Sequence, residues 1–87
     1  MLFDDIESTN GVTFGSKDVL AETGISLRQL YYWELKGIID PIVVRRKSRE
    51  FKRYTQEHIN RLKTVKELVD QGWTLTAAIA KTAWMKT

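Results

Sequence analysis

Residues 24–54 read GISLRQLYYWELKGIIDPIVVRRKSREFKRY, and this stretch decides the fold. It opens with a tight turn at Gly24, continues through an aromatic segment that is long enough for a short helix, and stops at Gly37. A basic segment over residues 45–53 follows, with the length of a β-hairpin. A helix beside a cationic hairpin is the layout that a small DNA-binding protein needs, so this stretch indicates nucleic acid as a partner.

Two short helices are expected to precede the basic segment. Ser16 can cap the first helix, and Gly24 can end it in a left-handed backbone conformation. Ser26 can cap the second helix, which is predicted to run through Lys36 and to stop at Gly37. Only about three residues separate the two helices, which is typical of a helix-turn-helix.

The basic segment is predicted to form a two-stranded wing. Residues 42–44 before the charges and residues 51–54 after them are rich in β-branched and aromatic side chains. The tip is expected at Lys47, Ser48 and Arg49. No Asn-Gly or Asp-Gly pair marks the turn, so its type stays open.

Two further helices complete the expected fold. Thr55 can cap a long amphipathic helix that ends at Gln71 and Gly72, and Thr74 can cap a last helix. Residues 1–12 show no sustained period and are interpreted as a flexible N-terminal arm, and residues 13–87 as one domain. The fold class predicted is therefore mainly α with a small β-hairpin: a winged helix-turn-helix of about four helices and a two-stranded wing.

Composition excludes several classes of protein. The chain has 87 residues, 43% of them hydrophobic and 29% charged, which fits one soluble globular domain. It has no cysteine and one histidine, His58, and no nucleophile–base pair or glycine-rich phosphate loop, so we expect neither an enzyme nor a bound cofactor or metal. No apolar run reaches the roughly 20 residues that span a bilayer. We expect a cytoplasmic, nucleoid-associated protein with no membrane partner.

Positive charge is concentrated in the wing. Residues 45–53 carry six basic side chains and one acid, a net charge of +5, while the whole chain is +3 and the remainder is therefore −2. Such a run is often only a solvated loop. Phe51 and Tyr54, interleaved with the charges, favour a segment that is anchored to a core and presented to an anionic partner.

Several motifs together resemble the N-terminal domain of MerR-family regulators. They cover about residues 14–82 in the family's order: Gly24-Ile25-Ser26, Leu30-Tyr31-Tyr32-Trp33-Glu34, Gly37-Ile38-Ile39-Asp40-Pro41, Phe51-Lys52-Arg53-Tyr54-Thr55 and Gln71-Gly72-Trp73-Thr74-Leu75. The resemblance implies a DNA-binding domain that distorts promoter DNA. Tyr31 stands where the family usually has an arginine, which puts one DNA contact in doubt. The dimerisation helix and effector domain of the family have no counterpart in these residues, so no small-molecule effector is expected within this chain.

The second helix is the expected recognition element. Arg28 is the best candidate for a specific base contact, because a guanidinium can bond both O6 and N7 of guanine. Gln29 can contact adenine or a phosphate, and Ser26 can act as a DNA contact or purely as a helix cap. The resemblance implies that the Tyr32 hydroxyl contacts a phosphate.

The wing is expected to contact the DNA backbone or the minor groove. Arg46 and Arg53 are the strongest candidates, because rigid strands would hold them, whereas Lys47 and Arg49 near the tip would supply diffuse attraction. The full set of wing candidates is Arg45, Arg46, Lys47, Arg49, Lys52 and Arg53.

Other prominent side chains are assigned more ordinary roles. Trp33 is expected in the core with Leu30, and Trp73 and Trp84 are placed in the core by default. Trp84 has the alternative of an exposed anchor for a second chain. His58 is interpreted as surface, and Arg61 as part of the basic face or simply solvated.

These features predict a sequence-specific transcriptional regulator that binds double-stranded DNA. One small module reads too few base pairs to select a genomic site, so we expect a dimer or side-by-side binding on repeated half-sites. Two alternatives stay open: an architectural, excisionase-like DNA-binding protein, and a protein-interaction adaptor whose wing binds an acidic partner. Binding to DNA would show steep salt dependence and sequence preference, and an adaptor would show no preference among duplexes.

Overall fold

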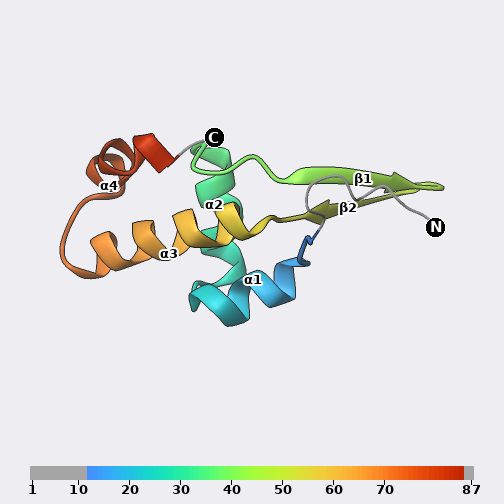
Figure 1. The fold of residues 1–87 in the computed structure, drawn as a ribbon, viewed down its shortest axis with the longest axis horizontal. Coiled ribbons are helices and arrows are strands. Elements are labelled where there is room, and N and C mark those ends of the chain that lie inside the picture. The colour runs from blue at the N-terminus through green and yellow to red at the C-terminus, as the bar shows by residue number, and fades with distance from the viewer. Residues whose placement is uncertain (1–11, 86–87) are drawn as a thin grey trace.

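The computed structural model describes residues 12–85; the predicted arm over residues 1–12 therefore lies almost wholly outside the described part. The chain is mainly helical with one two-stranded antiparallel hairpin, which confirms the predicted winged helix-turn-helix (Figure 1). In chain order the elements are α1 (Ser16–Thr23), α2 (Leu27–Leu35), β1 (Ile42–Arg46), β2 (Arg49–Arg53), α3 (Gln56–Asp70), α4 (Leu75–Lys81) and a 3-10 turn η2 (Ala83–Met85).

The N-cap of helix α1 lies one residue earlier than predicted. Gly15, not Ser16, is the N-cap, with extended backbone angles. The reason is Asp18, whose carboxylate is in reach of the Gly15 N–H at 3.3 Å and so fixes that residue as the cap. The predicted end is confirmed: Gly24 has φ 78° and its N–H donates to the Leu20 carbonyl.

Helix α2 has the predicted limits. The Ser26 hydroxyl accepts from the Gln29 backbone N–H at 3.1 Å, and the Gln29 side-chain oxygen accepts from the Ser26 N–H at 3.0 Å. These two bonds form a reciprocal capping box. The helix ends at Leu35 with Lys36 as its C-cap, and Gly37 with φ 84° turns the chain away.

The wing is a regular hairpin whose tip is shorter than predicted. Arg46 pairs with Arg49, so the loop holds only Lys47 and Ser48, and the placement of Arg49 at the tip was wrong. Lys47 makes this tight reversal possible because it adopts a left-handed φ of 54°. In Figure 1 the hairpin projects away from the helices along the 45 Å long axis of the molecule.

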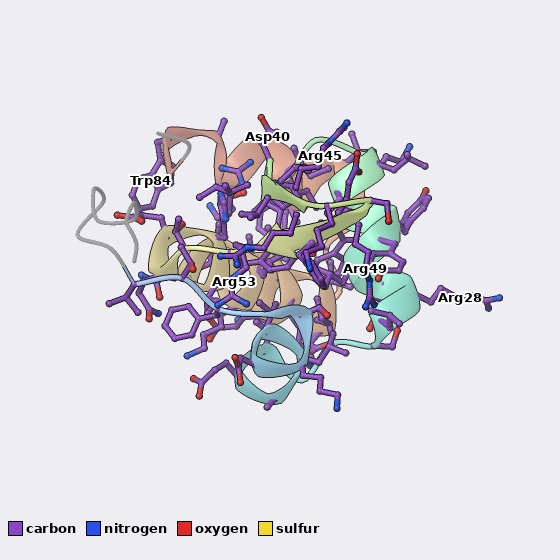
Figure 2. All side chains as sticks on the ribbon, turned by 90° about the vertical axis from the view of Figure 1, so that its right-hand side faces the viewer. Arg28, Asp40, Arg45, Arg49, Arg53 and Trp84 are labelled. Carbon is purple, nitrogen blue, oxygen red and sulfur yellow. The ribbon has the colours of Figure 1, made fainter. Side chains whose placement is uncertain are left out.

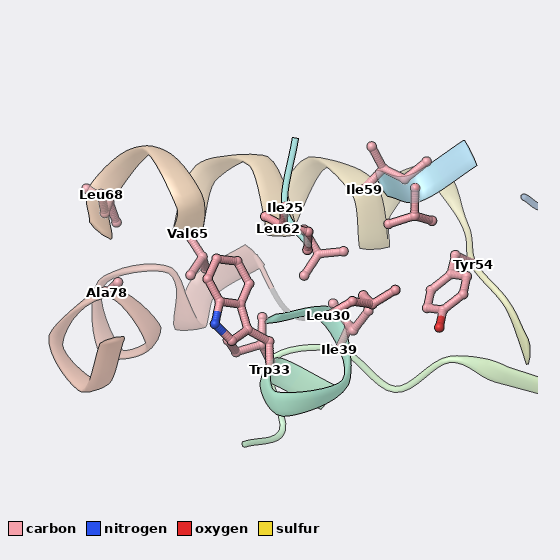
Figure 3. Packing of buried hydrophobic residues seen from close by; sticks show 12 residues of the cluster. Ile25, Leu30, Trp33, Ile39, Tyr54, Ile59, Leu62, Val65, Leu68 and Ala78 are labelled. Atoms are coloured by element: carbon pink, nitrogen blue, oxygen red, sulfur yellow. The ribbon is translucent and has the colours of Figure 1, made fainter. Parts of the chain in front are cut away.

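The core lies between α3 and the helices that cross it (Figure 3). Helix α3 buries Ile59, Leu62, Val65 and Leu68. Leu30 and Trp33 of α2 are buried with them, which confirms Trp33 as a core residue. The remaining buried hydrophobic residues in the cluster are Val19, Ile25, Ile38, Ile39, Tyr54 and Ala78. Burial of large apolar side chains of this kind stabilises the fold by about 1.5–3 kcal/mol each.

The default placement of the other two tryptophans in the core was wrong. Trp84 is 79% exposed and Trp73 is 41% exposed. Helix α4 has only seven residues, and Thr82 just after it is the last buried position among the described residues, so Trp84 lies outside the described core. Trp73 lies in the loop before α4, where the Lys81 ammonium approaches its ring to 5.0 Å.

Candidate nucleic-acid interface

One face of helix α2 packs into the core, and the other face is exposed to solvent. Leu30 and Trp33 anchor it in the core, while Arg28, Gln29 and Tyr32 are exposed. Figure 2 shows the Arg28 side chain extending from α2 away from the body of the protein. In helix-turn-helix proteins, side chains near the start of the second helix contact base edges, so Arg28 stays the predicted base contact.

The capping box at the start of α2 limits the DNA contacts that Ser26 and Gln29 can make. Ser26 serves as the N-cap, and the side-chain oxygen of Gln29 is already used by the Ser26 N–H. Recognition of adenine by a glutamine uses both its oxygen and its amide nitrogen. With the cap intact, one acceptor position of the Gln29 oxygen is occupied, which favours use of its amide N–H donors toward a phosphate oxygen or another acceptor.

Both tyrosines of α2 are exposed and each lies against a lysine. The Lys36 ammonium is 5.5 Å from the ring centre of Tyr32, and the Lys52 ammonium of the wing is 4.8 Å from the ring centre of Tyr31. The Lys36 ammonium therefore adds one positive charge beside Tyr32, which would favour an anionic contact there. Tyr31 instead connects α2 to the wing.

Three cations are concentrated at the end of the wing. Arg46 and Arg49 are directly opposite each other, with Lys47 between them in the loop. All three are exposed, and among residues 12–85 none of them forms an ion pair. The Arg49 guanidinium is 5.3 Å from the Phe51 ring centre. Because like charges held side by side repel one another, binding of a polyanion beside them is favourable.

The other three wing cations are engaged within the protein. Arg45 pairs with Glu50 across the strands, and Lys52 pairs with Glu34 of α2 at 2.8 Å. Arg53 donates to the side-chain oxygen and the backbone carbonyl of Thr13, at 3.2 and 3.1 Å. In Figure 2, a view along the wing, Arg53 lies by the segment that leads into α1.

Arg53 thus has a structural role that the sequence did not indicate. Its bonds to Thr13 lie next to backbone bonds in both directions between Phe14 and Tyr54. Together these contacts fasten the segment before α1 to the base of the wing. A phosphate contact by Arg53 remains a prediction, made from a side chain that is already half-buried.

Glu34 is a site residue that sequence reasoning missed. Its side chain is only 9% exposed, and its two oxygens accept from the Lys52 ammonium and, at 2.6 Å, from the Tyr54 hydroxyl. Burial and this bond raise the pKa of Tyr54 well above its ordinary value. The spacing of residues could have indicated this role. Glu34 stands four residues after Leu30 and so lies on the side of α2 that faces the core, where a carboxylate needs a partner.

His58 and Arg61 are not the surface residues that were expected. His58 is half-buried, and its Nδ1 accepts from the Thr55 N–H at 3.0 Å, which closes the capping box of α3. Burial lowers the pKa of His58. Arg61 is 4% exposed, and its guanidinium donates to the Thr82 carbonyl at the end of α4, so it belongs to the core rather than the basic face.

Within residues 12–85, no group of three or more His, Cys, Asp and Glu side chains is placed to hold a metal ion. None of the helices described is both long enough and apolar enough to cross a membrane.

Comparison with known protein families agrees with this geometry. A family model described as MerR HTH family regulatory protein matches residues 14–82, which is most of the chain. The matched range includes both helices of the helix-turn-helix, the wing, α3 and α4. No curated protein matches the chain.

Proposed function

The chain belongs to the MerR HTH family of DNA-binding regulators, and we propose that it is a sequence-specific regulator of transcription. In this proposal α2 enters the major groove and the wing lies along the neighbouring backbone or in the minor groove. Arg28 supplies the main base contact, and Tyr32 and Gln29 contact phosphates. The site of action is the nucleoid in the cytoplasm.

The observation that carries this proposal is the position of charge on the structure. The open face of α2 presents Arg28, and the end of the projecting hairpin presents Arg46, Lys47 and Arg49, none of which has an acidic partner among residues 12–85. One cationic group on a helix and three on a wing are suited to a groove and to the backbone beside it. Arg45, Lys52 and Arg53 contribute mainly by shaping the wing.

We further propose that two copies act together on DNA. A single module of this size contacts too few base pairs to discriminate against the many competing sites in a genome. Binding as a dimer or side by side on repeated half-sites would multiply the selectivity. We propose no small-molecule effector site within this chain.

Selection of bound duplexes from a random pool tests the proposal directly. A recovered motif that depends on Arg28 would support the regulator, and a palindrome or a direct repeat would reveal the symmetry of the assembly. Tight binding without any motif would favour an architectural, excisionase-like role. Absence of binding to every duplex at low salt would contradict DNA binding and leave the adaptor alternative.

A further inference from the structure

Glu34 joins the recognition helix to the wing through two short bonds. One carboxylate oxygen accepts from the Lys52 ammonium of β2, and the other from the hydroxyl of Tyr54 just after β2. The carboxylate is almost fully shielded from water, so these charge-assisted bonds are stronger than a surface ion pair. Both partners lie 18 or more residues away in the chain.

Tyr31 adds a second contact from the same helix to the same lysine. It precedes Glu34 by three residues, so both side chains lie on one side of α2. The Lys52 ammonium lies 2.8 Å from a Glu34 oxygen and 4.8 Å from the Tyr31 ring centre. Lys52 is thus held by a charge and an aromatic face at once.

The wing needs such contacts to hold one orientation. It is a two-stranded hairpin, and no other helix or strand of the described residues packs against its far end (Figure 1). A hairpin of this kind is marginally stable alone. At its base, Tyr54 is buried and Arg53 is fastened to Thr13, which leaves the side facing α2 to be fixed by Lys52.

We propose that Glu34, with Lys52 and Tyr31, forms a clasp that sets the angle between the recognition helix and the wing. Glu34 is a positioning residue: it touches no DNA, and it determines whether α2 and the wing tip reach their contacts together. Lys52 belongs to this clasp rather than to the set of phosphate contacts. The consequence for DNA selectivity depends on the proposed function, while the clasp itself does not.

The geometry of the clasp can be measured without DNA. The chain has no cysteine, so Leu35→Cys on α2 and Ser48→Cys in the wing loop allow two spin labels to be placed cleanly. Both positions are exposed. We expect a narrow distribution of distances between the labels in the parent chain and a clearly broader one in Glu34→Gln and in Lys52→Met. Lys52→Met leaves Glu34 and Tyr54 in place, so this variant still tests the clasp if Glu34→Gln fails to fold.

Two controls separate wing motion from general loosening. Labels at Leu35→Cys and Glu67→Cys join α2 to α3 and should give unchanged distances in all variants. Glu22→Gln removes an acid that pairs with Lys63 between α1 and α3, at 3.5 Å and with both side chains exposed, and should leave the wing distance unchanged. An unbroadened wing distance in both Glu34→Gln and Lys52→Met would overturn the clasp.

Binding to the selected duplex tests the consequence. For Glu34→Gln we expect the ratio of affinity for the selected duplex to affinity for a scrambled one to fall about tenfold, as loss of a charged hydrogen bond predicts. The slope of affinity with salt should stay within about one unit of the parent value, because no phosphate contact is removed. An unchanged ratio would overturn the role in selectivity. If the parent protein shows no preference, the proposed function fails and the spin-label distances still decide the clasp.

Discussion

Arg28 is the residue on which sequence recognition should depend most. Its side chain is exposed on the open face of α2, so replacing it does not disturb the core. We expect Arg28→Ala to cost about 1–3 kcal/mol at one or two base pairs and to relax the preference there. Competition with single-base variants of the selected duplex measures this. Lys17→Ala on α1 removes the same charge elsewhere on the surface and should leave the preference intact; an equal loss on all duplexes would make Arg28 a phosphate contact.

Glu50 limits the positive charge of the wing. It is the one acid in the hairpin and it pairs with Arg45 across the strands, where both side chains are exposed. We expect Glu50→Gln to strengthen binding to all duplexes and to steepen the salt slope by about one unit, because Arg45 becomes available to phosphates. Titrations at several salt concentrations measure both effects. Glu67→Gln, an exposed change on α3, is the matched control, and equal behaviour of the two variants would argue against a wing contact.

Arg61 shows how a basic residue can serve the core. Its guanidinium donates to the Thr82 carbonyl at the C-terminal end of α4, where positive charge is favourable, although its Nε has no partner among the described residues. We expect Arg61→Ala to lower the free energy of unfolding by about 2–3 kcal/mol. Arg61→Met keeps most of the buried stem and removes the unpartnered N–H, so it should cost less. Urea denaturation measures both, and an alanine variant as stable as the parent would contradict this role.

At the scale of elements, the cap of α3 makes stability depend on pH. His58 accepts from the Thr55 N–H only while its Nδ1 is unprotonated, and burial lowers its pKa in the folded state. The unfolded chain therefore binds a proton more readily, near pH 6.5, than the folded chain does. The contribution of His58 to the free energy of unfolding is fully present above about pH 6.5. It is lost as the pH falls from there toward the lower pKa of His58 in the folded state.

The variant His58→Gln isolates this effect. Glutamine at the same position can close a capping box and does not titrate. We expect the free energy of unfolding of the parent to fall between about pH 6.5 and 5 more than that of the variant, measured by urea denaturation at a series of pH values. The nearby acids Glu57, Asp40 and Glu34 act against burial on the pKa of His58. Parallel pH profiles for the two proteins would show that His58 is not the titrating group.

Elements governed by local chemistry could be predicted from the sequence. The end of α1 at Gly24, the caps at Ser26, Thr55 and Thr74, and the stop at Gly37 all follow from neighbours within a few residues. The two-residue wing loop was missed because no glycine or asparagine marks it, and Lys47 adopts the left-handed backbone instead.

Roles set by distant partners could not be predicted in the same way. Arg53 and Glu34 each bond to groups far away in the chain, Thr13 for the one and Lys52 and Tyr54 for the other. Arg61 was expected on the basic face or in solvent because charge is normally exposed, but its guanidinium bonds to a carbonyl 21 residues later and is buried in the core. Charge alone therefore predicted that the wing is basic, without indicating which of its cations remain available for DNA.

The whole molecule is elongated, with its wing at one end and α4 at the other (Figure 1). Its longest extent of 45 Å exceeds the spacing of half-sites one helical turn apart, about 34–36 Å. With the long axis along the duplex, neighbouring copies on one face would therefore lie within contact distance. We expect two copies to bind cooperatively to a duplex with two half-sites spaced by one turn. A duplex with a single half-site should bind one copy weakly and with little selectivity.

Inserting about five base pairs between the half-sites gives the decisive comparison, because it rotates one half-site to the opposite face of the duplex while keeping every base contact. If contact between copies supplies the cooperativity, the insertion should abolish it, and insertion of a full turn should restore part of it. Sedimentation of protein–duplex mixtures gives the stoichiometry, and titrations of the three duplexes give the cooperativity. Tight and selective binding of one copy to one half-site would contradict the paired assembly and leave the clasped helix and wing sufficient for recognition.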